Sequence, residues 1–168
     1  LACPHCGQPL DASARPVRCP AGHSFDVAKQ GYLNLLGAAP PANADTAPMV
    51  EARARFLATG AYSPIAALLA RCLTRSDAAE SDAWLEVGAG TGWYLAAALD
   101  AVPKARGIAM DVSVAAARRA ARAHPRAAAI VADVWRPLPV LPTSLDAIAC
   151  VFAPRNLGEF ARVLRPEG

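Results

Sequence analysis

The sequence predicts an α/β protein in which an open parallel sheet follows a small metal-bound module. From about residue 83 onward, short apolar runs alternate with helical segments, as in consecutive βα units. A glycine-rich turn, Gly88–Gly92, separates the first of these runs from the helix after it. Three cysteines and two histidines occur among the first 23 residues. With 168 residues, 54% of them hydrophobic, the chain is long enough for one core and a small appendage.

The N-terminal cysteines have the spacing of a zinc site. Cys3 and Cys6 form a Cys-x2-Cys turn, which allows both thiolates to face one ion. Cys19 and His23 complete a Cys3His set, which a structural Zn²⁺ prefers in tetrahedral geometry. About thirty residues cannot bury a self-sufficient core, so this module needs a metal to fold. We expect a β-hairpin in residues 8–18, between the two ligand pairs.

A disulfide and an extra histidine are the two alternatives to this ligand set. Disulfides would leave one odd thiol, and the sequence shows no secretory signal pattern, so a metal is the better interpretation. His5 is an extra candidate ligand, but its place inside the turn is expected to point its side chain away from the metal. Cys72 and Cys150 lie in apolar runs and are expected to be core residues.

The region between the zinc module and the glycine turn predicts a linker and two helices. Residues 25–36 carry aromatic and apolar side chains and are expected to form strand pairs that pack on the zinc module. Residues 37–48 are rich in Ala and Pro, so a linker or mobile loop is expected there, with the domain boundary in it. The predicted division is a zinc domain at 1–36, a linker at 37–48 and a second, α/β domain at 49–168.

Two helices are expected before the sheet. The first covers residues 49–57 and ends at Gly60, and the second starts at Ser63 and Pro64. The second presents a core-facing stripe at helical spacing, namely Ile65, Leu68, Leu69, Cys72 and Leu73. A polar connection at 76–82 leads into the glycine turn.

The glycine turn predicts a nucleotide-type site. Residues 85–87 read as a buried strand, and Gly88, Gly90 and Gly92 let the backbone approach a ligand before the helix at 93–99 begins. The dinucleotide fingerprint would require a small residue where Trp93 stands. A nicotinamide dehydrogenase is therefore disfavoured. The pattern here is an acidic residue, Glu86, followed by three alternating glycines.

The following units place carboxylates at strand ends. A strand at 106–110 ends in Asp111, where a bidentate hydrogen bond to ribose hydroxyls is expected. Ser113 caps a helix over 114–123, and a further strand at 127–132 ends in Asp133. The remaining elements are an irregular proline-rich loop at 135–142, a strand at 145–152 and a helix at 157–164. A full sheet of this type needs about three more strands, so we expect the chain to be incomplete at its C-terminal end.

The segment Glu86-x-Gly88-x-Gly90-x-Gly92 resembles motif I of class I S-adenosylmethionine-dependent methyltransferases. The resemblance implies a Rossmann-like sheet, here C-terminally incomplete, with S-adenosylmethionine as cofactor. The glycine loop would wrap the amino-acid and ribose end of the cofactor, and Glu86 would help to orient its methionine part. Asp133 would contact the adenine amino group, although a turn or capping role is an equally ordinary reading for it.

Taken as a whole, the chain resembles the bacterial 23S ribosomal RNA guanine-N1-methyltransferases, with an N-terminal zinc domain before a class I methyltransferase domain. The run Asp26-x-Ala28-Lys29-x-Gly31-Tyr32-x-Asn34-Leu35-Leu36 is the most specific match. The other matches are the zinc ligands, Asp45, Met49, Arg53, Phe56-Leu57, Gly60-x-Tyr62-x-Pro64, Gly88-x-Gly90-x-Gly92-x-Tyr94, Asp111-Val112-Ser113 and Ala153-Pro154. The resemblance implies zinc ligation by Cys3, Cys6, Cys19 and His23, and cofactor contacts from Tyr62, Gly90, Thr91, Asp111 and Asp133.

The implied reaction is methylation of N1 of a guanine in a 23S rRNA hairpin loop, with macrolide-type antibiotic resistance as an associated expectation. The proton on N1 must leave as the methyl group arrives, yet no catalytic base stands out near 153–156. The expected docking surface is the zinc module, with Arg15, Arg18, Lys29 and Tyr32, although a solvated basic face is an equal alternative. The same two readings apply to the unpaired basic series Arg118, Arg119, Arg122 and Arg126.

Composition sets the remaining expectations. The formal net charge of +3 is compatible with an RNA partner without proving one. No run of eighteen apolar residues occurs and no secretory signal opens the chain, so a cytoplasmic protein without a membrane partner is expected. A homodimer is left open. Two rival functions remain: a non-catalytic RNA- or protein-binding module with a vestigial cofactor pocket, and a small-molecule methyltransferase.

Overall fold

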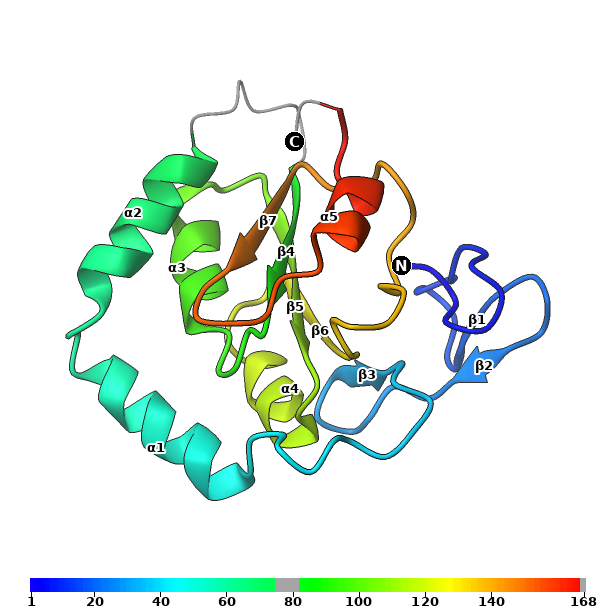
Figure 1. Ribbon diagram of the computed structural model, residues 1–168, viewed down its shortest axis with the longest axis horizontal. Helices are drawn as coiled ribbons and strands as arrows, with labels where there is room; N and C mark the ends of the chain where they lie inside the picture. The colour runs from blue at the N-terminus through cyan, green and yellow to red at the C-terminus, as the bar shows by residue number, and fades with distance from the viewer. Residues whose placement is uncertain (75–81, 167–168) are drawn as a thin grey trace.

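A five-stranded, all-parallel sheet forms the centre of the molecule (Figure 1). The computed structural model describes residues 1–74 and 82–166, so most of the predicted connection at 76–82 lies outside the described residues. The sheet strands are β3 (Tyr32–Asn34), β4 (Ala83–Val87), β5 (Arg106–Asp111), β6 (Ala127–Val131) and β7 (Ala147–Cys150), in the order β3-β6-β5-β4-β7. The helices are α1 (Ala47–Ala58), α2 (Ser63–Leu73), α3 (Trp93–Ala101), α4 (Val114–Ala120) and α5 (Leu157–Val163).

The strand order creates a switch point beside β4. From β4 the chain adds β5 and then β6 on one side, and it returns to add β7 on the other. In open α/β sheets, ligands bind in the crevice outside the carboxyl ends of the strands at such a point. The glycine turn directly follows β4, which places it at this crevice.

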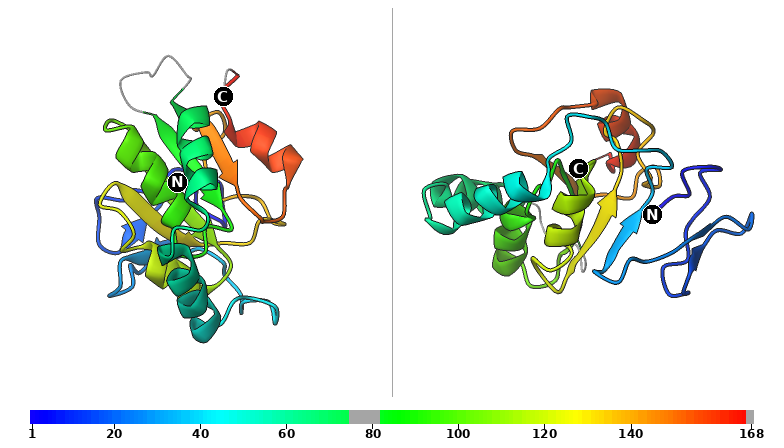
Figure 2. Two further views of the ribbon diagram at one scale, coloured as in Figure 1. Left: turned by 90° about the vertical axis from the view of Figure 1, so that its left-hand side faces the viewer. Right: turned by 90° about the horizontal axis from the view of Figure 1, so that it is seen from below.

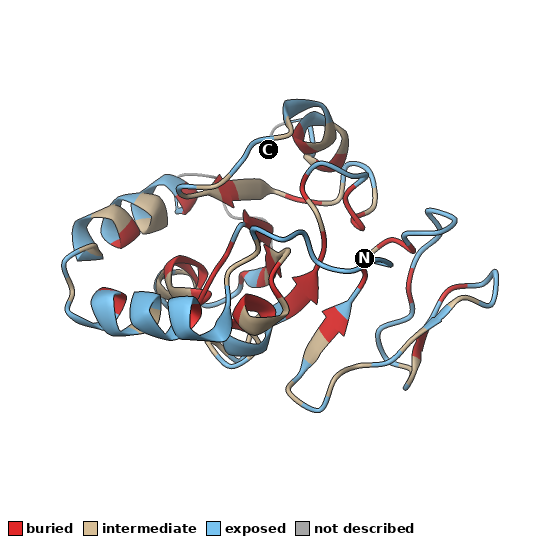
Figure 3. Cartoon of the chain, turned by 60° about the horizontal axis from the view of Figure 1, so that its bottom comes forward, coloured by how far each residue is buried: buried red, intermediate tan, exposed pale blue. Residues whose placement is uncertain are grey.

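Alternate residues of each strand face two different apolar layers, because successive side chains on a strand point to opposite faces. Trp84 of β4 packs with Leu95 and Leu99 of α3, while Leu85 packs with Phe160 and Val163 of α5. Figure 2 shows α3 and α4 on one side of the sheet and α5 on the other. Both faces are covered, and the inner strands β4, β5 and β6 hold more buried residues than the edge strands β3 and β7 (Figure 3).

The zinc module packs onto the α5 side of the sheet. Cys3, Leu10, Val17 and Cys19 belong to the same buried apolar cluster as Leu85 and the other strand residues facing α5. The backbone N–H of Ala2 also donates to the carbonyl of Pro139, at 2.9 Å. The N-terminal module and the sheet therefore share one core, although their different compositions predicted two separate domains.

The structure corrects two predictions for the first 36 residues. The predicted hairpin within 8–18 is wrong: a single bridge joins Asp11 to Arg18 there, and β1 (Val17–Arg18) pairs instead with β2 (Ser24–Phe25). The turn that reverses the chain is the one holding Cys19 and His23, where the His23 carbonyl accepts the Cys19 N–H. The strand pairs expected at 25–36 are also only partly local, because β3 leaves the module to become an edge strand of the main sheet.

The buried face of α2 differs from the predicted stripe. Ala66 and Leu73 are buried and contact the α3 layer, whereas Leu68 is 52% exposed and Cys72 is also exposed. The prediction of Cys72 as a core residue is therefore wrong, and Cys150 is half-buried. The error has a physical reason: α2 packs against α3 rather than directly on a broad sheet face, so a narrow stripe is enough to cover the contact.

The predicted βα units otherwise agree with the structure to within a few residues at their ends. The largest difference is β7, which covers 147–150 rather than 145–152, because Leu145 instead forms a parallel bridge with Leu164 after α5. The helix predicted at 114–123 ends at Ala120, and residues 135–142 lack helix and strand, as expected.

One residue of the predicted basic series has a structural role. The Arg126 guanidinium donates to the carbonyls of Leu99, Val102 and Ala105, the last two at 2.7 Å. It therefore caps the C-terminal end of α3 and is not available to a partner. Arg118, Arg119 and Arg122 are exposed on α4 and its end. Among the described helices, none alone is long and apolar enough to cross a membrane, and α1 and α2 reach the required length only together, with an 85° bend between them.

Candidate active site and metal centre

The four predicted zinc ligands converge. The ligand atoms of Cys3, Cys6, Cys19 and His23 all lie within 4.8 Å of one another. The Cys6 and Cys19 Sγ atoms are 3.7 Å apart, and the His23 Nδ1 atom lies 3.3 Å from Cys19 Sγ and 3.6 Å from Cys3 Sγ. A tetrahedral zinc ion with ordinary Zn–S and Zn–N bonds separates its ligands by roughly 3.4–3.8 Å. The donor types and their spacing therefore fit a structural Zn²⁺.

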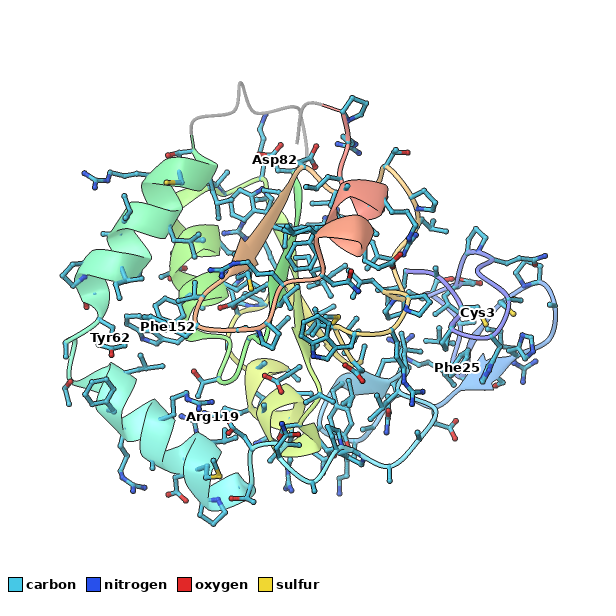
Figure 4. The ribbon with its side chains drawn as sticks, in the orientation of Figure 1. Cys3, Phe25, Tyr62, Asp82, Arg119 and Phe152 are labelled. Carbon is cyan, nitrogen blue, oxygen red and sulfur yellow. The ribbon has the colours of Figure 1, made fainter. Side chains whose placement is uncertain are left out.

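His5 does not belong to this group. Its ring stacks on Phe25 of β2, with ring centroids 5.8 Å apart and an interplanar angle of 11°. His5 is outside the group of four converging ligands, although its ring centroid also lies 5.0 Å from that of His23. Figure 4 shows Cys3 and Phe25 together in this module, at a distance from the glycine turn.

A pocket of about 660 Å³ opens at the carboxyl ends of β4, β5, β6 and β7. This volume is in the range of sites that hold a cofactor-sized ligand. Of the eight predicted cofactor residues, six line it: Tyr62, Gly88, Gly90, Thr91, Asp111 and Asp133. Glu86 and Gly92 do not line it, because the first is buried beneath the turn and the second faces α4.

The glycine turn is tightly packed against the loop after β7. Gly88 has φ +64°, and a Cβ atom built on it would lie 2.4 Å from the Cβ of Ala153. Gly92 has φ +72° and would bring a Cβ to 3.0 Å from the Cβ of Ala123. Glycine is therefore required at Gly88 both by conformation and by close approach, which fixes the turn across the switch point.

Asp111 supports the turn from the end of β5. Its Oδ2 accepts the Gly90 N–H at 2.8 Å, and its Oδ1 accepts the Ser113 N–H at 2.8 Å. Burial raises the pKa of Asp111, and these two hydrogen bonds oppose that rise. Each oxygen keeps a further lone pair for a ligand hydroxyl, so the predicted ribose contact remains chemically open.

Glu86 supports the first turn of α3 rather than the pocket. Its side chain is 1% exposed, and its Oε2 accepts the Leu95 N–H at 3.1 Å. Burial raises the pKa of Glu86 to about 8, the Leu95 hydrogen bond opposes this rise, and nearby Asp111 adds to it. Glu86 thus supports the helix that follows the glycine turn, and its predicted role in orienting the methionine part of the cofactor stays a prediction.

This buried acid predicts a pH dependence of stability. Between pH 4.5 and 8 the unfolded chain loses the Glu86 proton while the folded chain keeps it, so stability falls as pH rises, by at most ~1.4 kcal/mol per pH unit from this group. We expect Glu86→Gln to flatten that slope and to be the more stable protein at pH 8. Urea unfolding at pH 5 to 8 measures it, with exposed Glu51→Gln as the control. An unchanged slope in Glu86→Gln would contradict the prediction.

Two buried hydroxyls face the pocket without a partner. Among the described residues, no hydrogen-bond partner is found for Thr91 Oγ1 or for the hydroxyl of Tyr94. Both residues line the pocket and are almost fully buried. Buried polar atoms are normally satisfied, so these two hydroxyls point to a polar ligand in the pocket. Tyr94 was not among the predicted site residues, although it stood in the matching run.

Thr91→Val tests this interpretation. The change removes the hydroxyl and keeps the shape of the side chain. We expect the affinity for S-adenosylmethionine to fall about tenfold while stability is unchanged or higher, because no protein hydrogen bond is lost. Calorimetric titration and thermal unfolding measure the two effects. Thr74→Val, at the exposed end of α2, is the matched control; equal affinities in both variants would rule out the ligand contact.

The segment predicted as a linker forms part of the pocket wall. Residues 41–45, apart from 42, line the pocket. Asp45 forms an ion pair with Arg53 of α1, and its carbonyl accepts the Ser113 hydroxyl at 2.6 Å. The carboxylate and the guanidinium both lie at the pocket. Neither residue was a predicted site residue, and the Ala- and Pro-rich composition around them gave no signal of this contact.

The remaining predicted residues lie where solvent can reach them. Asp133 Oδ1 accepts the Trp135 N–H at 2.9 Å, which holds the loop after β6 at the pocket. This turn role is compatible with the predicted adenine contact and does not test it. Arg15, Arg18 and Lys29 are exposed, as a docking surface requires, whereas Tyr32 is half-buried at the sheet edge.

The fold and this pocket together define a class I methyltransferase domain: a glycine turn at the switch point, a carboxylate at the end of the next strand, and a pocket large enough for the cofactor. A family model described as a methyltransferase domain matches residues 85–168, and one described as the RlmA N-terminal zinc ribbon matches residues 1–40.

Among solved structures, a methyltransferase in complex with the Haloferax volcanii Trm112 methyltransferase activator has a TM-score of 0.59 at 24% identity, covering 76% of this chain and 59% of that one. An assigned S-adenosyl-L-methionine-dependent methyltransferase of Methanococcus maripaludis has a TM-score of 0.58 at 18% identity, covering 74% and 63%. These two structures bear on the fold alone.

Two curated relatives are similar to the whole of this chain. The 23S rRNA (guanine(748)-N(1))-methyltransferase of Streptomyces fradiae is 48% identical over all of this chain and 60% of its own length. A protein of Micromonospora griseorubida assigned as a 23S rRNA (guanine-N(1)-)-methyltransferase is 51% identical, again over the whole chain and 63% of its own length. The chain belongs to the methyltransferase-domain family whose model covers residues 85–168, and over its whole length it is similar to these two relatives, with an RlmA-type zinc ribbon matched at residues 1–40. It spans about three fifths of the length of these curated relatives.

Proposed function

We propose that the protein to which this chain belongs transfers a methyl group from S-adenosylmethionine to N1 of a guanine in a 23S rRNA hairpin loop. The observation that carries the proposal is the joining, through one core, of a methyltransferase pocket and a zinc ribbon of the RlmA type. The relatives that share both parts over the whole chain are named for this reaction. Their identity to this chain also disfavours a small-molecule methyltransferase and a non-catalytic module.

The chain's residues would bind and orient the cofactor in this proposal. Bound S-adenosylmethionine supplies a methyl group on a positively charged sulfur, which is transferred by in-line displacement. Gly88 and Gly90 let the backbone approach it, Asp111 accepts from its ribose hydroxyls, and Thr91 and Tyr94 offer their unpartnered hydroxyls. Tyr62 closes the pocket from the start of α2. Such a transfer depends on position more than on a strong acid or base.

The proton on guanine N1 is the remaining chemical requirement. The carboxylates that line the described pocket are Asp45, Asp111 and Asp133. Asp45 is paired with Arg53, Asp111 accepts two backbone N–H groups and Asp133 holds its own turn. None of the three lies on the β7 side, where a base would meet a substrate. We therefore propose that the proton passes to solvent, with no side chain of this part of the chain acting as general base.

RNA docking is proposed on the zinc module and the exposed face of α4. Arg15, Arg18 and Lys29 on the module, and Arg118 and Arg119 on α4, are exposed cations. Phosphate contacts of this kind position an RNA without reading its sequence, while a loop base is splayed out for chemistry. Cytoplasmic localisation, a homodimer and a link to macrolide resistance belong to the same proposal. Light scattering of the purified protein and macrolide susceptibility of expressing cells test the last two.

The experiment uses the full-length protein. S-adenosylmethionine and, as control, NAD are titrated calorimetrically, and 23S rRNA hairpins are incubated with protein and cofactor. A methyl group on N1 blocks base pairing, so reverse transcription stops at a modified guanine. Saturable binding of S-adenosylmethionine together with a new stop at one guanine supports the proposal. Binding without any methylated RNA would favour the small-molecule methyltransferase, and no binding would favour the non-catalytic module.

A further inference from the structure

Phe152, at the carboxyl end of β7, has two features that are each energetically unfavourable. Its φ is +57°, in the left-handed region that is rare for residues other than glycine and unfavourable for a bulky side chain. The residue is nevertheless 76% exposed, so the conformation is not compensated by burial in the described molecule. Strained backbone of this kind persists where the surrounding structure imposes it, and it is concentrated at functional sites.

The surrounding structure fixes Phe152 in this conformation. On its C-terminal side, Ala153 packs against Gly88 so closely that no Cβ fits on the glycine. The Cys150 thiol donates to the carbonyls of Ala153 and Pro154, at 3.3 and 3.4 Å, which ties the turn back to β7. The strained residue is therefore locked to the glycine turn and presents its ring at the pocket.

Aromatic neighbours extend this surface. The Tyr62 ring lies 5.8 Å from that of Phe152, and Phe56 meets Tyr62 edge-on at 5.1 Å. Figure 4 shows Phe152 and Tyr62 side by side between the loop after β7 and the helix pair α1–α2. Trp135, 66% exposed, lines the same pocket from the loop after β6. The mouth of the pocket is thus lined with flat apolar rings.

Such a surface suits a planar ring system that stacks face to face on an aromatic side chain, and the target base of the proposed reaction is such a group. Enzymes that modify a base extrude it from its helix or loop and stack it on aromatic side chains. We propose that Phe152, supported by Tyr62, is the platform on which the target guanine stacks before methyl transfer. This inference rests on the proposed function and assigns the substrate base to one side of the same pocket.

Phe152→Gly in the full-length protein tests the inference. Glycine adopts the observed φ without strain, so the melting temperature is expected to stay the same or to rise. Affinity for S-adenosylmethionine is expected to change less than twofold. Because base stacking on an aromatic ring accounts for roughly 10- to 100-fold in binding, kcat/KM for the rRNA hairpin is expected to fall by about that factor.

The conservative variants separate stacking from simple bulk. Phe152→Tyr is expected to retain most of the activity towards the hairpin, and Phe152→Leu to lose about as much as Phe152→Gly. Leu157→Ala, which removes another exposed apolar side chain that does not line the pocket, is the control expected to be neutral. Unchanged kcat/KM in Phe152→Gly would overturn the proposal. A lowered melting temperature in that variant would also overturn it, by showing that the ring is a packing residue.

A failure of the proposed function is recognised separately. If the unmodified protein neither binds S-adenosylmethionine nor methylates the hairpin, the function itself is rejected and the assignment of Phe152 falls with it. If the unmodified protein is active and Phe152→Leu is as active as the unmodified protein, the function stands and the stacking platform is rejected.

Discussion

Cys19→Ser is expected to release the metal and to destabilise the whole protein, with zinc content falling from about one ion per chain to nearly none. Cys19 is a buried member of the ligand set and of the core that joins the zinc module to the sheet. Loss of a structural metal is among the few single changes that lower the free energy of unfolding by more than about 4 kcal/mol. For a protein of this size we expect the melting temperature to fall by roughly 10 °C.

The measurement combines zinc analysis by mass spectrometry with thermal unfolding of the full-length protein. Cys72→Ser is the matched control, because Cys72 is exposed on α2 and lies outside the ligand set. We expect the control to keep both its zinc and its melting temperature. A Cys19→Ser protein that retains one zinc ion and the original melting temperature would show that the four residues do not form the site.

Gly88→Ala is expected to distort the cofactor pocket. The added Cβ would meet the Cβ of Ala153 at 2.4 Å, and alanine is unfavourable at φ +64°. The conformational cost and the clash together amount to about 3 kcal/mol. Since the glycine turn and the loop after β7 must move apart, we expect affinity for S-adenosylmethionine to fall at least tenfold.

Gly158→Ala is the control for this second prediction. Gly158 lies in α5, where an added Cβ would meet no atom closer than 3.9 Å, and its backbone does not require glycine. We expect the free energy of unfolding of Gly158→Ala to rise by about a few tenths of a kcal/mol, because alanine favours a helix. Calorimetric titration and urea unfolding compare the two variants. If Gly88→Ala bound S-adenosylmethionine like the unmodified protein, the turn would not form the cofactor site.

The sheet was predictable because its signals are local. Each βα unit carries an apolar run, a turn residue and a helix, and the glycine turn marks the first unit without reference to the rest of the chain. The strand β3 was not predictable in the same way. Its pairing with β6 depends on two segments far apart in sequence, and nothing within Tyr32–Asn34 indicates which sheet the strand joins. The prediction of the buried face of α2 was wrong for a similar reason, because α2 packs against another helix that the α2 sequence does not identify.

The site residues likewise fall into those with a local sequence signal and those without one. Cys3, Cys6, Cys19 and His23 were predictable because ligand spacing reflects the geometry of a metal ion. Asp111 and Gly88 were predictable because strand ends in one sheet meet at one edge. Asp45 and Arg53 reach the pocket through an irregular segment, whose path depends on tertiary contacts that no periodicity records. Phe152 was missed because a strained φ has no sequence signature in a residue other than glycine.

The position of β3 has a consequence for the order in which the protein folds. Leu33 finds its partner Ile130 only after most of the described chain has been made. Pairing between such distant segments closes a long loop and is slow. We therefore expect the metal turns, whose ligands lie within 23 residues, to form early, and the edge strand to dock late. Until it docks, β6 exposes a strand edge open to pairing with other chains, so the late step is the one at which aggregation competes with folding.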